Sequence, residues 1–163
     1  MTRTDVLASA PLGNAVFELV REVEPPSSYD SVSGMSSVRA RIGAGDEWAP
    51  VDSLPALVRW AENRGLDLAA EVSKAPAVFA EFVAALELDS RALTDPGLYG
   101  FVEEQFPVLL ERESPRVEGD RLLFVGGRFR LHQAPQIWRI SVDLMNGTVD
   151  EEPVPPRPES LGS

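Results

Sequence analysis

The sequence predicts an α+β domain with about four helices followed by a C-terminal antiparallel meander of three to four strands. One further strand is expected earlier in the chain. Three observations lead to this prediction. The chain has 163 residues, which suits one domain with its own core. Apolar residues recur at helical spacing in several segments before residue 107, and from Glu118 onward they alternate as in strands. We expect the domain to span residues 1–152 and residues 153–163 to form a Pro-rich extended tail.

Four segments carry the signals of helices. Residues 14–24 begin at a potential Asn cap and stop at a Pro-Pro pair. The next helix, which ends at residue 64 before a glycine, begins with a cap at Asp52 or Ser53 and has a proline in its first turn. Residues 73–88 and 94–106 each have a wide apolar face. We expect the core to include the apolar residues of these four faces: Val16, Leu19, Val20 and Val23; Leu54, Leu57, Val58 and Ala61; Val78, Phe79, Phe82, Val83 and Leu86; Leu98, Phe101, Val102 and Phe106.

One segment between the first two predicted helices has the pattern of a strand, and further strand patterns follow near the C-terminus. Residues 37–42 alternate between polar and apolar side chains, which predicts a half-buried strand that could lie at the edge of a sheet. The meander is predicted from four further segments: 121–125, 128–132, 137–143 and 148–150. We expect turns at Gly126-Gly127 and at Asn146-Gly147, because both pairs tolerate the positive φ of tight hairpins.

The residue inventory excludes several kinds of chemistry. The chain has no cysteine and a single histidine, His132, so disulfides, thiolate metal sites and multi-histidine metal sites are impossible. Neither a glycine-rich phosphate loop nor a nucleophile elbow is present. A triad can be drawn from Ser141, His132 and Asp143, but it lacks the strained turn of a nucleophile. We therefore expect no cofactor, no metal and no catalytic residue.

The overall charge favours a protein partner. The 26 acidic residues outnumber the 15 basic ones, which gives a net charge of −11. Such a charge repels nucleic acid and anionic lipid at long range, and no apolar run is long enough to cross a membrane. We expect a cytoplasmic protein whose partner presents a basic surface, with no contact to nucleic acid or membrane. The oligomeric state stays open.

Acidic and basic residues separate along the chain. Residues 81–120 contain ten acidic residues and three arginines, whereas residues 121–140 contain four arginines and no acidic residue. The alternation of strand side chains predicts that a basic face is formed by two neighbouring strands of the meander. The expected members of this face are Arg128, Arg130 and His132 on one strand, and Arg139 with Asp143 on the next.

Three interpretations of this separation are open. The arginines could bind a small anionic ligand, because guanidinium groups match carboxylates and phosphates. The acidic segment, with Glu103 and Glu104, could dock on a basic partner. The two segments could also neutralise each other within the fold. Trp48 is open in the same way, since it could anchor an interface or pack under its loop.

For the charge separation itself, we favour mutual neutralisation within the fold. Of the two functional interpretations, we favour docking on a basic partner. The sequence predicts a non-enzymatic acidic binding protein that acts through protein–protein contact, such as an inhibitor, an immunity-like protein or an accessory adaptor that masks a basic partner. The alternative is a small domain that binds an anionic ligand on its arginine-lined sheet face.

Overall fold

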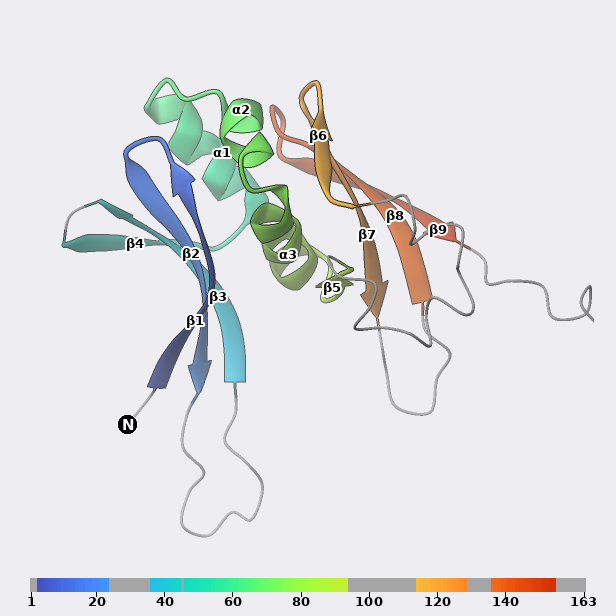
Figure 1. Ribbon diagram of the computed structural model, residues 1–163, viewed down its shortest axis with the longest axis horizontal. Helices are drawn as coiled ribbons and strands as arrows, with labels where there is room; N and C mark the ends of the chain where they lie inside the picture. Colours follow the sequence, from blue (N-terminus) through green and yellow to red (C-terminus); the bar gives the residue numbers. More distant parts are fainter. Residues whose placement is uncertain (1–2, 24–35, 45, 94–113, 129–135, 155–163) are drawn as a thin grey trace, which may run out of the picture.

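The protein is built in three layers, with helices between two antiparallel sheets (Figure 1). The computed structural model describes residues 3–23, 36–44, 46–93, 114–128 and 136–154. The first sheet has four strands in the order β1-β2-β3-β4. The second has five strands, in the order β5-β7-β8-β9 with β6 beside β7. The protein is thus an α+β protein that consists mostly of strand.

The first sheet comes from the N-terminal third of the chain. Its strands are β1 (Arg3–Leu12), β2 (Ala15–Val23), β3 (Ser36–Ala44) and β4 (Glu47–Val51). Every neighbouring pair is antiparallel. The strand predicted over 37–42 is present as β3, but it lies between β2 and β4 and not at an edge.

The predicted helix over 14–24 is wrong, because residues 15–23 form β2. Alternate residues of β2 face the helices, among them Phe17 and Leu19, which are buried. The apolar residues of this segment fit a helical period and a strand period about equally well. Pairing with β1 on one side and β3 on the other decided the outcome, and its Val and Phe side chains suit a pleated sheet.

The middle layer contains three helices in the described part of the chain. They are α1 (Leu54–Asn63), α2 (Leu68–Ser73) and α3 (Pro76–Glu87). The prediction for α1 is confirmed in detail: the Ser53 hydroxyl caps its start by accepting from the Ala56 amide, and Gly65 follows its end with φ +66°. The helix predicted over 73–88 is present as α3, while α2 was not predicted as a separate helix.

The second sheet comes from the C-terminal part of the chain. Its strands are β5 (Arg91–Ala92), β6 (Arg116–Glu118), β7 (Arg121–Arg128), β8 (Gln136–Asp143) and β9 (Thr148–Val154). β7, β8 and β9 are consecutive antiparallel neighbours, and the predicted turn at Asn146-Gly147 joins β8 to β9. The strands predicted separately over 121–125 and 128–132 are wrong as separate strands, because β7 runs unbroken from 121 to 128. The tail was predicted from residue 153, but β9 includes the first two of its residues, and 155–163 lie outside the described residues.

The predicted Gly126-Gly127 turn is wrong, because β7 continues through both glycines to Arg128. Neither glycine has a positive φ. A Cβ atom on Gly126 would lie 2.5 Å from Cδ1 of Ile140 on the paired strand. The glycine leaves room for the end of the Ile140 side chain and does not form a turn.

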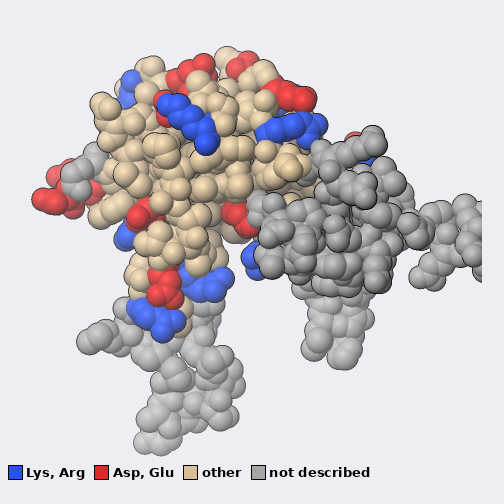
Figure 2. Space-filling view, in the orientation of Figure 1, with Lys and Arg blue, Asp and Glu red and all other residues tan. Residues whose placement is uncertain are grey.

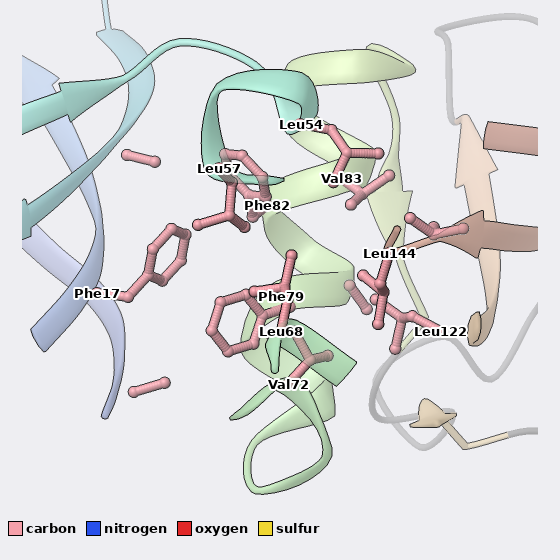
Figure 3. Packing of buried hydrophobic residues seen from close by; sticks show 14 of the residues in the cluster. Phe17, Leu54, Leu57, Leu68, Val72, Phe79, Phe82, Val83, Leu122 and Leu144 are labelled. Atoms are coloured by element: carbon pink, nitrogen blue, oxygen red, sulfur yellow. The ribbon is translucent and has the colours of Figure 1, made fainter. Parts of the chain in front are cut away.

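One hydrophobic cluster extends through all three layers (Figure 3). Phe17 of the first sheet stacks on Phe79 of α3 at 4.7 Å between ring centroids and meets Phe82 edge-on at 5.2 Å. On the other side of the helices, Leu122 and Leu144 belong to the same cluster. The predicted order of four helices followed by a meander is therefore wrong, since the helices separate two sheets. The helix predicted over 94–106 lies outside the described residues.

Candidate functional site

The two described arginines of the expected basic face lie on opposite faces of the second sheet. Arg128 pairs with Gln136 and shares its face with Trp138, whereas Arg139 pairs with Val125 on the other face. The prediction placed a turn at Gly126-Gly127. Because β7 continues through both glycines, its residues 121–128 pair with residues 136–143 of β8, and this register differs from the predicted one. Arg130 and His132 lie outside the described residues, so the basic face is not formed as one surface by the part of the chain that the structure describes.

Arg128 has a structural position beside helix α3. Its Nη2 donates to the carbonyl oxygen of Leu88 at 2.6 Å, and its Nε donates to that of Asp89 at 3.2 Å. Its guanidinium also lies 5.0 Å from the ring centroid of Trp138. A cation at the C-terminal end of a helix neutralises carbonyls that have no partner within the helix. Arg128 thus connects β7 to the end of α3.

Arg139 lines a pocket of about 290 Å³ on the outer face of the second sheet. Arg116 also lines this pocket, but so do three acidic residues of β9: Asp150, Glu151 and Glu152. Two cations and three anions do not make a site that selects an anionic ligand.

Asp143 organises the turn between β8 and β9. Its carboxylate accepts from the amides of Met145 and Asn146 and from the Asn146 side chain, at 2.9–3.1 Å. The side-chain bond from Asn146 and these backbone bonds hold the pKa of Asp143 below its ordinary value. Asp143 is therefore a hydrogen-bond acceptor that fixes the turn. The turn holds Met145 at the surface, where 62% of the Met145 surface is exposed.

Trp48 lies on the outer face of the first sheet, away from the helices. It pairs with Gly43 across β3 and β4 and is 45% exposed. The Arg41 guanidinium stands 4.3 Å from the ring centroid, and Arg41 also forms an ion pair with Glu18 at 2.8 Å. The ring is held in place on an open surface.

The acidic segment is described only at its two ends, and Glu103 and Glu104 lie outside the described residues. Glu81 contacts Arg91 at 3.9 Å, and Glu87 accepts from the amide of Leu54 at the start of α1. At the other end, Glu118 forms an ion pair with Arg116. These acids are used within the fold, whereas Asp120 lines a groove between the helices and the second sheet.

This groove is the most distinctive site among the described residues. It has a volume of about 400 Å³ and lies where the end of α1 and the start of α2 meet the turns of the second sheet. We call it the acid-rimmed groove. Its acidic members are Glu62, Asp67 and Asp120, and its apolar members are Val58, Ala61, Leu66, Leu68, Ala69, Leu144 and Met145.

Two turns of the second sheet are fixed against each other and against α1 at this groove. The amide of Leu144 donates to the carbonyl oxygen of Asp120 at 2.9 Å and so ties the β8–β9 turn to the β6–β7 turn. A Cβ atom on Gly147 would lie 3.2 Å from Cα of Pro55, which shows how closely the β8–β9 turn approaches α1. The groove is therefore formed where these two turns pack directly against each other and against α1.

The charged residues that line the acid-rimmed groove are all acidic. No lysine or arginine lines the acid-rimmed groove. A neighbouring hollow of about 330 Å³ shares Asp120 and Met145 and contains Arg121. That arginine donates to Ser141 at 2.9 Å and contacts Asp150 at 3.4 Å, so its charge is already used. In Figure 2, acidic side chains stand along the upper edge of the molecule, where Figure 1 places α1, α2 and β6, and Lys and Arg side chains lie beside and below them.

The groove has no direct signature in the sequence. Its members come from five separate elements and turns, and each has an ordinary local explanation, such as Asp67, which caps α2. The one usable signal is Met145, an apolar residue in the middle of a predicted hairpin turn.

Comparison of the chain with protein-family models, with curated proteins and with solved structures gives no match. Among the described residues, no group of three potential metal ligands comes together, and no helix is long and apolar enough to cross a membrane.

Proposed function

We propose that this chain is a cytoplasmic, non-enzymatic binding protein that masks a basic segment of a partner protein in the acid-rimmed groove. The observation that carries the proposal is the pairing of an apolar floor with three carboxylates and no lining cation. An inhibitor, an immunity-like protein or an accessory adaptor would each work in this way.

The groove suits side chains that are apolar along their length and positive at their tip. Lysine and arginine have such side chains, which bury their methylene groups and keep the charge at the rim. Met145 adds an adaptable contact, because a thioether side chain repacks easily around different partners. A volume of about 400 Å³ accommodates a few side chains, so we expect a short basic and apolar segment to enter.

The charge of the whole chain supports the same partner. A net charge of −11 attracts a basic surface at long range and speeds the encounter at low ionic strength. The alternative of an anionic ligand at the arginines has less support, because Arg128 is engaged at the end of α3 and Arg139 shares its pocket with three acids.

The proposal is tested by reversing charge in the groove. We expect the double variant Glu62→Lys, Asp120→Lys to bind a short leucine–lysine peptide at least about tenfold more weakly than the unchanged protein. The matched control is Glu47→Lys, Asp52→Lys, which changes the net charge equally on exposed residues outside the groove. Affinity is measured by titration calorimetry at low and high salt.

The control variant distinguishes binding of the peptide in the acid-rimmed groove from a general effect of net charge on peptide affinity. Equal loss of affinity in both double variants would mean that only net charge matters, and the groove would then not be the binding site. Binding of a leucine–glutamate peptide with the same affinity would also contradict the proposal.

A further inference from the structure

A second groove lies on the opposite side of the helical layer. It has a volume of about 270 Å³ and is formed by the inner face of the first sheet together with α3 and β5. We call it the Arg21 groove. Its lining residues are Leu7, Ala8, Leu19, Arg21 and Val38 from the sheet, and Glu81, Ala85 and Arg91 from the helix and β5.

The groove exists because the first sheet is longer than the helix that covers it. In Figure 1 the lower ends of β1, β2 and β3 extend past α3, which leaves part of their inner face uncovered by the helices. A bulge between Val6 and Ala8 interrupts the pairing of β1 at this place and leaves Leu7 44% exposed. Ala8 and Ala85 are short, so the space between sheet and helix stays open.

Arg21 brings a positive charge without a partner to this apolar space. Among the described residues, its guanidinium has no hydrogen bond, ion pair or ring contact. Asp5 lies opposite Arg21 in the register of β1 and β2, but its carboxylate bonds Arg3 at 3.2 Å. An exposed arginine on the face of a sheet that otherwise packs against helices calls for an explanation.

The remaining charges of the groove nearly cancel. Arg91 contacts Glu81 at the long distance of 3.9 Å. Taken together, Arg21, Arg91 and Glu81 carry a net charge of +1, which matches a ligand with one negative charge. The apolar residues between the sheet and the helix match a chain or ring system of low polarity.

We propose that the Arg21 groove binds a small amphipathic monoanion, with its carboxylate at Arg21 and its apolar part between β2, β3 and α3. This site is separate from the acid-rimmed groove and shares no lining residue with it. The proposal therefore goes beyond the function proposed above and stands or fails independently of it.

Decanoate is a suitable probe, because it has one carboxylate on an unbranched apolar chain of a size that suits the volume of the groove. We expect saturable binding of one decanoate per chain in titration calorimetry, below the concentration at which decanoate aggregates. The variant Arg21→Gln should bind it about tenfold more weakly, because it removes the uncompensated charge. The control Arg39→Gln removes an arginine from the opposite face of the same sheet, and its affinity should not change.

Two further variants test the geometry. Ala85→Leu should fill the groove and abolish binding, while far-UV circular dichroism confirms that the fold is retained. Glu81→Gln should strengthen binding several-fold, because it removes the negative charge at the rim. Tighter binding cannot result from damage to the fold, so this variant keeps the test valid even if the others are unstable.

Three results would overturn the proposal: no saturable binding of decanoate, equal affinity of the unchanged protein for decanol, or equal loss of affinity in Arg21→Gln and Arg39→Gln. Loss of peptide binding at the acid-rimmed groove would not affect any of these measurements.

Discussion

At the scale of the residue, Gly43 is fixed by the ring that lies over it. A Cβ atom at this position would come within 2.5–2.7 Å of three ring atoms of Trp48. The variant Gly43→Ala should therefore displace the indole from its place beside Arg41 and lower the free energy of unfolding by about 1–3 kcal/mol. Urea unfolding followed by circular dichroism measures this change.

The control for this prediction is a double-mutant cycle with Trp48→Ala. If the collision with the ring is the cause, Gly43→Ala should cost much less when the ring is absent. An equal cost in both backgrounds would place the cause in the backbone of β3.

At the scale of the element, Arg128 joins strand β7 to the end of helix α3. The helix ends next to Asp89, which has a φ of +47°, and the two carbonyls that accept from Arg128 belong to this irregular end. We expect Arg128→Ala to lower the free energy of unfolding by about 1–3 kcal/mol, because it leaves both carbonyls without their charged donor.

Arg139→Ala is the matched control for Arg128→Ala, since it removes an arginine from the neighbouring strand on the other face of the sheet. Arg139 is exposed, so solvent screens the contacts that it makes, and its loss should lower the free energy of unfolding by about 0–1 kcal/mol. Similar costs for the two variants would contradict the assignment of Arg128 to the end of α3.

At the scale of the whole molecule, Glu71 connects the first sheet to the helical layer. Its carboxylate on α2 accepts from the amide of Gly13 in the β1–β2 turn at 3.1 Å and from Lys74 at 3.2 Å. The bond from Gly13 and, to a smaller extent, the contact with Lys74 lower the pKa of Glu71, although burial acts in the opposite direction. The ionised form is therefore the one that the fold stabilises.

This contact predicts how stability depends on pH. Because the pKa of Glu71 is lower in the folded chain than in the unfolded one, the contribution of Glu71 is complete above the unfolded value and is lost as the pH falls through the folded value. Between about pH 5 and pH 3, the free energy of unfolding should fall more steeply in the unchanged protein than in Glu71→Gln. Glu47→Gln, at an exposed edge position, should follow the unchanged protein. Parallel curves for the unchanged protein and Glu71→Gln would refute this assignment.

The sequence determined the elements whose signals are local. The start and end of α1 follow from Ser53, Pro55 and Gly65, because capping and positive φ depend only on near neighbours. The β8–β9 turn follows from Asn146-Gly147 for the same reason, and the absence of cysteine limits the chemistry of the chain without any structure. The alternation of polar and apolar side chains along Trp138 to Asp143 was also read correctly.

The tertiary structure decided everything that depends on which segments meet. Residues 15–23 form a strand that pairs with β1 and β3, and β7 continues through Gly126 and Gly127, which pair with Trp138 and Ile137 of β8. The continuation of β7 placed Arg128 and Arg139 on opposite faces of the second sheet. Both grooves are formed by residues far apart in the chain, so no local pattern could reveal them. Local interactions fix where an element begins and ends, whereas burial and strand pairing fix which surfaces come together.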